Sequence, residues 1–264
     1  MNDHRALMLA ALLSLAGAGH ALAAASQWEE VQGAAVRVVI SDQPDADGRM
    51  RGALQIELQP GWKTYWIDPG DAGVPPSVAL SVDGRPGAVE IGYPVPGRHD
   101  DGYSVWAGYD HPVSFALTID APAPAGGPLE FAVFLGVCET ICIPLQATLT
   151  VQPGDAAGSE HKAIVDGAFD SLPGEPRPGL RVVAARVEGE HVRIETEAPT
   201  GAAPELFLAS TVARMFGAPA EPPQGDGRVF LVPLVTNDTA EPEQARYTLV
   251  SGDEAVSGVI TIDP

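Results

Sequence analysis

The sequence has few of the residues and patterns on which several common functions depend. Its 264 residues carry 15 basic and 35 acidic side chains, a formal net charge of −20, and only two of the basic residues are lysines, Lys63 and Lys162. Nucleic-acid binding needs clustered cations that neutralise phosphates, so this composition argues against it. Beyond residue 18 no apolar stretch reaches the ~18 residues that a membrane span requires, and we do not expect a membrane-embedded protein.

Aromatic residues are also scarce, at 6% of the chain, whereas 45% of the residues are apolar, which is enough for a hydrophobic core. This apolar content argues against a disordered chain. The 29 glycines and 25 prolines make up about a fifth of the sequence and leave little room for long helices. The length is suited to one large domain or two modest ones.

The only long apolar run lies at the N-terminus. Residues 6–18 read ALMLAALLSLAGA, which has the length of the apolar region of a secretory signal and is too short to span a bilayer. Two small-x-small patterns follow at residues 21–25, as a cleavage site requires. We therefore predict a cleavable signal peptide at residues 1–23 and a mature protein in the periplasm, where disulfides persist.

The remaining chain is predicted to form two β domains. Apolar and polar residues alternate at 54–58, 147–151 and 192–196, which is typical of half-buried strands, and turn clusters rich in Gly, Pro and Asp separate such runs. Residues 160–172 instead place apolar residues at helical spacing, and three prolines follow them. We predict an all-β protein with one β-sandwich at residues 28–153, a short helix and linker at 154–179, and a second β-sandwich at 180–264.

The two cysteines, Cys138 and Cys142, carry most of the functional information. In one continuous strand they would lie ~13 Å apart, whereas a disulfide needs Cα atoms about 4.4–6.8 Å apart, so a bond between them requires a tight turn. Three interpretations follow from the spacing: a redox-active pair, a structural staple, or a copper(I) site formed with His99 or His111. A staple this short would remove only ~2 kcal/mol of unfolded-state entropy, which favours the redox interpretation.

Two segments resemble a known family. Residues 61–73, GWKTYWIDPGDAG, and residues 137–144, VCETICIP, are similar in sequence and order to motifs of the N-terminal periplasmic domain of DsbD-like thiol:disulfide interchange proteins, in particular the ScsB-like branch. The similarity covers about residues 28–151. It implies immunoglobulin-like sandwiches that relay reducing equivalents from a membrane-embedded module to periplasmic thioredoxin-like proteins.

The resemblance also implies roles for single residues. Cys142 corresponds to the cysteine that forms mixed disulfides with partners, and Cys138 to the one that resolves them. Residues 98–109 resemble the family's cap loop, with Gly102 in the place of the usual phenylalanine at its tip and Tyr103 beside it. Trp62 and Tyr65 stand where the family places aromatic residues near the cysteines; core packing is the alternative for both.

We therefore expect a periplasmic thiol–disulfide oxidoreductase of the protein-disulfide reductase type, which uses no organic cofactor or metal. The sequence ends without the membrane and thioredoxin-like domains of the full-length family members, so we expect a free-standing version fed by a separate membrane electron carrier. The alternatives are a copper-handling protein that uses the same cysteines, and a noncatalytic β-sandwich binding module with a structural disulfide.

Overall fold

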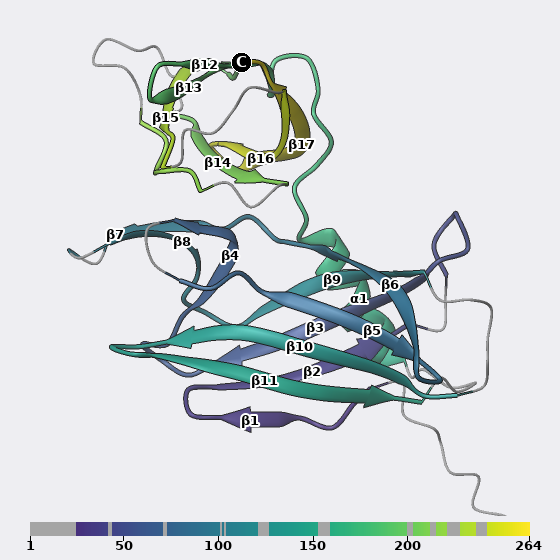
Figure 1. Ribbon diagram of the computed structural model, residues 1–264. Helices are drawn as coiled ribbons and strands as arrows, with labels where there is room; N and C mark the ends of the chain where they lie inside the picture. Colours follow the sequence, from purple (N-terminus) through teal and green to yellow (C-terminus); the bar gives the residue numbers. More distant parts are fainter. Residues whose placement is uncertain are drawn as a thin grey trace, which may run out of the picture.

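The computed structural model describes residues 25–41, 44–70, 73–100, 102, 104–120, 127–152, 159–199, 203–211, 215–220, 228–235 and 242–264. The signal peptide expected at residues 1–23 lies outside these ranges. Among these described residues there is one helix and the rest of the regular structure is strand. The strands form two groups: β1–β11 in a larger first domain and β12–β17 in a smaller second domain (Figure 1). Among the described residues, no helix has the length and apolarity needed to cross a membrane.

The first domain is built on an eight-stranded antiparallel sheet with the strand order β1-β2-β3-β9-β6-β5-β10-β11. Its two edge strands, β1 and β11, contact each other, so the sheet curves around its own core. A second sheet has the order β4-β8-β7 and covers one end of that core. The strands of the first domain are β1 (Glu29–Val31), β2 (Ala34–Ile40), β3 (Met50–Leu58), β4 (Thr64–Gly70), β5 (Ser77–Val82), β6 (Arg85–Gly92), β7 (Gly97–Asp100), β8 (Val105–Tyr109), β9 (Val113–Asp120), β10 (Leu129–Cys138) and β11 (Cys142–Val151).

Period-two patterning explains which side chains enter the core. In β3, Leu54, Ile56 and Leu58 are buried while Gln55 and Glu57 between them are not. Alternate side chains of a strand point to opposite faces, so a single face of β3 packs inward.

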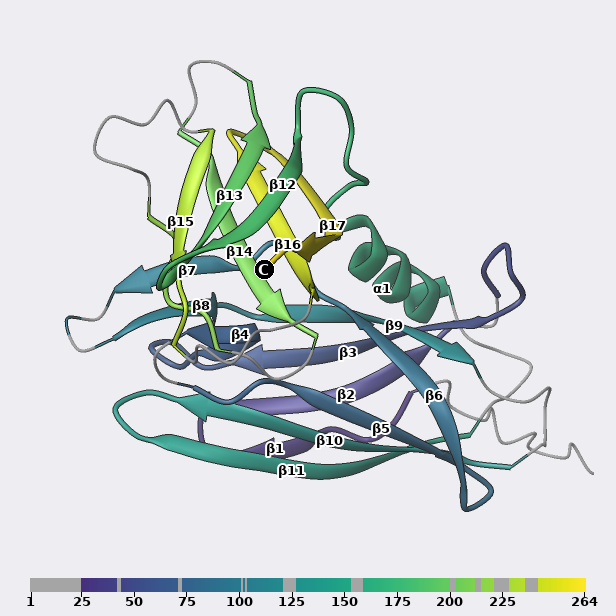
Figure 2. The same cartoon turned by 45° about the horizontal axis from the view of Figure 1, so that its top comes forward.

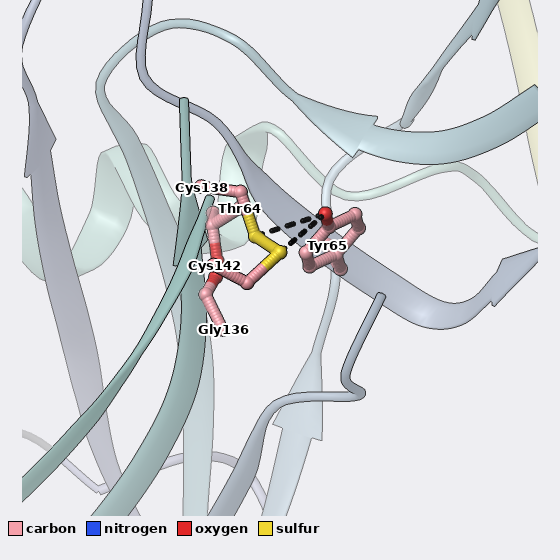
Figure 3. Close-up of a disulfide and its surroundings, with 5 residues drawn as sticks. All are labelled: Thr64, Tyr65, Gly136, Cys138 and Cys142. Atoms are coloured by element: carbon pink, nitrogen blue, oxygen red, sulfur yellow. Dashed lines mark hydrogen bonds between the residues drawn. A yellow bond between two sulfur atoms is a disulfide. The ribbon is translucent and has the colours of Figure 1, made fainter. Parts of the chain in front are cut away.

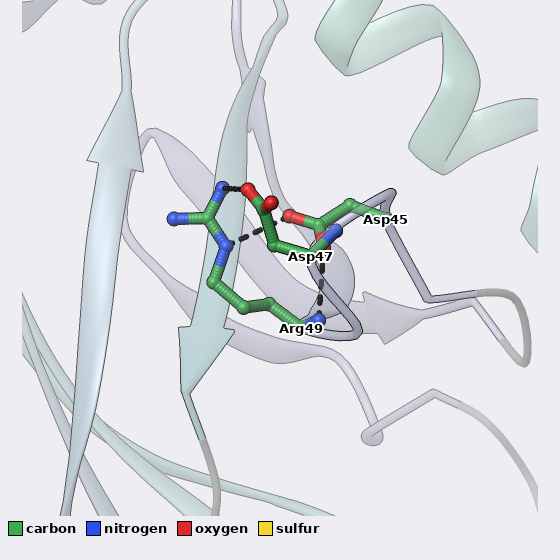
Figure 4. Close-up of polar contacts among 3 residues, drawn as sticks. All are labelled: Asp45, Asp47 and Arg49. Carbon is green, nitrogen blue, oxygen red and sulfur yellow. Dashed lines mark hydrogen bonds and ion pairs between the residues drawn. The ribbon is translucent and has the colours of Figure 1, made fainter.

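The turn between β2 and β3 illustrates how acidic residues shape the connections (Figure 4). The Asp45 carboxylate accepts hydrogen bonds from the backbone N–H groups of Asp47 and Arg49 and from Arg49 Nε, and Gly48 takes the positive φ of 81° that closes the turn. Desolvation acts to raise the pKa of Asp45, but these hydrogen bonds outweigh it and lower the pKa. Here Asp serves turn geometry, which is how we interpret the other Asp-Gly clusters.

The helix α1 (Ser159–Asp170) packs on the outer face of the eight-stranded sheet. Val165 and Ala168 are buried against Val39, Ala53 and Ala116 of β2, β3 and β9. A salt bridge of 3.2 Å between Arg51 and Asp166 borders this contact. The predicted helix is therefore present, and it packs on the first domain.

The second domain consists of two three-stranded sheets, β12-β13-β15 and β14-β16-β17. Its strands are β12 (Arg181–Glu188), β13 (His191–Glu197), β14 (Glu205–Ser210), β15 (Val229–Pro233), β16 (Glu243–Ser251) and β17 (Glu254–Ile262). They enclose their own apolar core. Seen from the second viewpoint, this domain stands over β4, β7 and β8 of the first one (Figure 2). Two side chains of β14, Phe207 and Ala209, pack in the core of the first domain instead.

Candidate functional site

The two cysteines close the hairpin of β10 and β11. Cys138 is the last residue of β10, Cys142 is the first residue of β11, and the two face each other in the ladder with Cα atoms 4.1 Å apart. They form a disulfide (Figure 3). Glu139, Thr140 and Ile141 form the tight turn that the bond requires.

The sulfurs differ sharply in exposure. Cys138 is 1% exposed and follows the fully buried Val137, whereas Cys142 lies at the surface. Ile141, beside it in the turn, is 70% exposed. Cys142 also begins β11, which is the last strand in the sheet order. Pro144 lies in the same edge strand, where a residue without a backbone N–H is tolerated. The disulfide is therefore reachable from the Cys142 side and covered on the Cys138 side.

Strand β4 supplies the cover. The backbone of Lys63, just before β4, exchanges two hydrogen bonds of 2.8 and 2.9 Å with Cys138, and Thr64 Oγ1 donates to the Gly136 carbonyl at 3.0 Å. These bonds fix the position of the next residue, Tyr65. Its hydroxyl lies 3.0 Å from Cys138 Sγ and 3.6 Å from Cys142 Sγ (Figure 3). Both sulfurs thus share one polar neighbour, which lies closer to the buried one.

Trp106 of β8 completes a small buried cluster with Tyr65 and Cys138. Its ring meets that of Tyr65 edge-on, with 6.0 Å between centroids. Trp106 also stacks on His99 of β7, with ring centroids 4.0 Å apart. Lys63 Nζ lies over the Trp106 ring, 4.4 Å from its centroid. The hairpin β7–β8 thus lies over the Tyr65 side of the disulfide.

A close backbone approach fastens this hairpin to β4. Gly108 pairs with Tyr65, and a Cβ atom at Gly108 would lie 2.2 Å from the Thr64 carbonyl oxygen. Only glycine allows this separation. A displacement of β8 would therefore be passed directly to the strand that carries Tyr65.

The residues singled out from the sequence fall in three places. Cys138, Cys142 and Tyr65 come together at the disulfide. Trp62 packs in the main core of the first domain, with its ring against Gly33. Tyr103, expected at the tip of the cap, lies outside the described residues.

Sequence reasoning did not single out Trp106, His99 or Lys63 for the cover. No Lys, Arg or His lies within five residues of either cysteine, yet the fold brings Lys63 beside Cys138 through the backbone pairing. The available signal was the resemblance of residues 98–109, which contain His99 and Trp106, to the family's cap loop. Within the described ranges, no group of three or more His, Cys, Asp or Glu residues is placed to hold a metal ion.

The comparisons with known proteins agree with this geometry. Residues 31–153 match the family model described as thiol:disulfide interchange protein DsbD, N-terminal, which confirms the resemblance for this part of the chain. No curated protein matches the sequence.

The crystal structure of the N-terminal periplasmic domain of ScsB from Proteus mirabilis is similar to this chain with a TM-score of 0.72. The two are 20% identical, and the match covers 91% of this chain and 99% of that one. At this identity the likeness shows the fold. It confirms the predicted all-β architecture of immunoglobulin-like sandwiches.

Proposed function

From the family match of residues 31–153 we propose that this chain is a thiol–disulfide exchange module with Cys138 and Cys142 as its redox pair. In this proposal it passes reducing equivalents from a separate membrane electron carrier to thioredoxin-like proteins. It acts in the periplasm, which agrees with the signal-like N-terminus and with the periplasmic origin of the ScsB domain. The chemistry needs only the two sulfurs.

The unequal exposure of the sulfurs is the observation that carries this proposal. Thiol–disulfide exchange proceeds by attack of a thiolate on one sulfur while the other leaves, so access decides which sulfur is attacked. Cys142 is exposed and Cys138 is 1% exposed. An incoming protein thiolate can therefore reach Cys142, with Cys138 as the leaving group.

Reduction of the module consumes one dithiol of the donor. A donor thiolate attacks Cys142 Sγ, a mixed disulfide forms, and Cys138 leaves as a thiolate that takes up a proton. The second thiol of the donor then attacks the donor sulfur that is bonded to Cys142, and Cys142 leaves as a thiol. The donor ends as a disulfide, and the module has gained two electrons and two protons.

Delivery runs the same steps in the opposite direction. The Cys142 thiolate attacks a disulfide of the acceptor, one acceptor sulfur leaves, and Cys138 then attacks Cys142 Sγ to restore the bond seen here. The acceptor leaves as a dithiol, so electrons and protons balance.

Tyr65 is placed to assist both directions. Its hydroxyl is 3.0 Å from Cys138 Sγ, where a thiolate develops when Cys142 is attacked. A hydrogen bond to an ionised acceptor is stronger than one to a neutral acceptor, so this contact strengthens as charge develops on the leaving sulfur. We propose Tyr65 as the group that stabilises the leaving thiolate.

A redox titration tests the proposal. The purified protein is equilibrated with mixtures of reduced and oxidised dithiothreitol or glutathione, and the fraction of free thiol is measured by alkylation. We expect a reduction potential above the ~−300 mV that is typical of structural disulfides. A potential well below that value would favour the structural-staple interpretation and contradict exchange.

A further inference from the structure

The second domain contacts the first directly behind the redox site. Phe207 of β14 is 1% exposed and lies in the core of the first domain. Its ring meets that of Trp66 edge-on with centroids 5.8 Å apart. Trp66 is the neighbour of Tyr65 in β4, so the two faces of one strand carry the interdomain contact and the disulfide contact.

Arg98 of β7 ties the hairpin β7–β8 to the same strand of the second domain. Its guanidinium donates to the Leu206 carbonyl at 2.7 Å and to Glu205 Oε1 at 3.2 Å. It also lies over the Phe207 ring at 4.6 Å. Burial lowers the pKa of Arg98, while Glu205 opposes that shift. Three kinds of contact thus converge on a single side chain.

Within its own sheet, the outer strand β7 of this hairpin is paired with β8 alone. β7 has four residues and is the last strand in the order β4-β8-β7. The ladder from β8 to β4 is irregular between Tyr65 and Gly70. Two cavities are lined by residues of both domains: the one beside Arg98 and Phe207 has a volume of only about 20 Å³, whereas the one beside Tyr93 and Arg246 has about 420 Å³. The contact is therefore tighter on the Arg98 side.

A continuous series of contacts leads from this anchor to the sulfur. Arg98 precedes His99, which stacks on Trp106. Trp106 meets the Tyr65 ring, and the Tyr65 hydroxyl reaches Cys138 Sγ. Every step is either a covalent neighbour or a packed pair.

We propose that Arg98 is a positioning residue through which the second domain holds the β7–β8 hairpin against the Cys138–Cys142 disulfide. This assigns the second domain a role in the exchange chemistry and rests on the proposed function. Without the anchor the hairpin relaxes, Trp106 no longer presses on Tyr65, and the hydroxyl loses its alignment with Cys138 Sγ. The reduced state then loses a partner that the oxidised state needs less, because the buried Cys138 thiol can accept from the hydroxyl or donate its S–H to it, whereas a disulfide sulfur can only accept.

The test is the equilibrium constant for reduction by dithiothreitol. In this reaction one dithiothreitol sulfur attacks Cys142, Cys138 leaves, and the second dithiothreitol sulfur closes its ring, so both cysteines end as thiols. We expect Arg98→Ala to lower this constant about 3- to 10-fold, the range set by the loss of one hydrogen bond. The matched control is Arg246→Ala, because Arg246 pairs with Glu90 of β6 at 3.3 Å across the two domains without touching the hairpin. We expect this control to stay within twofold of the wild type.

A double-mutant cycle separates positioning from general destabilisation. If Arg98 acts through Tyr65, Tyr65→Phe lowers the constant in the wild-type background and has little further effect in the Arg98→Ala background. Additive effects of the two substitutions, or an unchanged constant in Arg98→Ala, would overturn the proposal.

Failure of the proposed function and failure of the positioning role give different results. A wild-type potential below ~−300 mV would contradict the proposed function itself, whereas a higher wild-type potential with an inert Arg98→Ala contradicts only the positioning role. If Arg98→Ala does not fold, Glu205→Ala removes one of the guanidinium contacts and leaves the bond to Leu206. The same direction of change is expected there, with a smaller effect, and no change would count against the anchor.

Discussion

At the scale of single residues, the site depends on one hydroxyl that lies beside two bonded but unlike sulfurs. Tyr65 stands 3.0 Å from the buried sulfur and 3.6 Å from the exposed one. In the proposed exchange, the buried sulfur is the one that leaves as a thiolate, with little water around it. A hydrogen-bond donor at that atom offsets part of the cost of burying the charge.

Removing this hydroxyl should make the disulfide harder to reduce, because the buried Cys138 thiol of the reduced protein loses a hydrogen-bond partner. A hydrogen bond of this kind contributes about 1 kcal/mol, which corresponds to about 20 mV for a two-electron couple. We expect Tyr65→Phe to lower the reduction potential by roughly that amount. Equilibration with dithiothreitol, followed by alkylation and mass spectrometry, measures it.

The matched control is Tyr109→Phe. Tyr109 is also buried, and its hydroxyl donates to the Pro94 carbonyl at 2.8 Å instead of to a sulfur. Its loss should affect stability and leave the potential unchanged. Equal shifts in the two variants would show that the effect is not specific to the disulfide.

The core of this site was accessible from sequence, and its surroundings were not. Cys138, Cys142 and Tyr65 lie in two motifs that can be read directly. Trp106 could not be assigned because its contact with Tyr65 depends on β8 pairing with β4 across some forty intervening residues. Sequence periodicity reports which face a side chain takes, and it does not report which strand lies opposite.

At the scale of elements, the β10–β11 hairpin does not depend on the disulfide for its pairing. The two strands are in register over ten residue pairs, and β10 also pairs with β5. Closing so short a loop stabilises the fold by only ~2 kcal/mol in the chain-entropy account. The reduced protein should therefore keep its fold, as a module that cycles between two states must.

Circular dichroism and thermal melts with and without reductant check this expectation. We expect superimposable far-ultraviolet spectra and a moderate fall in the melting temperature. Cys138→Ala with Cys142→Ala is the corresponding variant without reductant. Loss of the folded spectrum on reduction would mean that the bond is structural.

An ion pair in the β12–β13 hairpin of the second domain predicts how the stability of the fold changes at acidic pH. Arg181 donates to Glu197 through two nitrogens at 2.9 and 3.0 Å, and these bonds, with the N–H of Gly179, lower the pKa of Glu197 from 4.5 to about 2. A lowered folded-state pKa gives stability that is present above the unfolded value and lost as the pH falls toward the folded one. The window is therefore pH 4.5 down to about 2.

Urea unfolding of the wild type and Glu197→Gln across this window tests the assignment. Because the variant lacks the titrating group, the wild type should be more stable by a constant amount above pH 5, and this advantage should shrink as the pH falls below about 4.5. An advantage that stays the same down to pH 2.5 would contradict the role of this ion pair.

Most of the elements could be predicted locally, and their assembly could not. The Asp45 turn and the helix α1 follow from residue types and spacing. The docking of α1 on the sheet depends on small residues, Ala53 and Ala116, on the outer faces of β3 and β9. The alternation of apolar and polar residues in these strands is that of an ordinary half-buried strand. Such a local pattern does not distinguish a face that a helix covers from one that a sheet covers.

At the scale of the whole molecule, residues of the second domain, Phe207 and Ala209 of β14, complete the core of the first. Phe207 comes from the second domain and packs among residues of the first, beside Trp66 and under Arg98. A sequence pattern marks Phe207 as buried without stating in which core. The contact places the second domain directly behind the strand that lines the disulfide, which gives a physical reason for the two to act together.

In the proposed function this molecule exchanges disulfides with another protein through Cys142, and trapping the mixed disulfide decides whether it does. Cys138→Ala leaves the exposed sulfur without its resolving partner, whereas Cys142→Ala leaves only a buried one. Each variant is incubated with an oxidised thioredoxin-like protein and analysed by non-reducing electrophoresis and mass spectrometry. We predict that mixed disulfides accumulate with Cys138→Ala and hardly form with Cys142→Ala; the reverse pattern would exchange the two roles, and no adduct from either variant would contradict the exchange function.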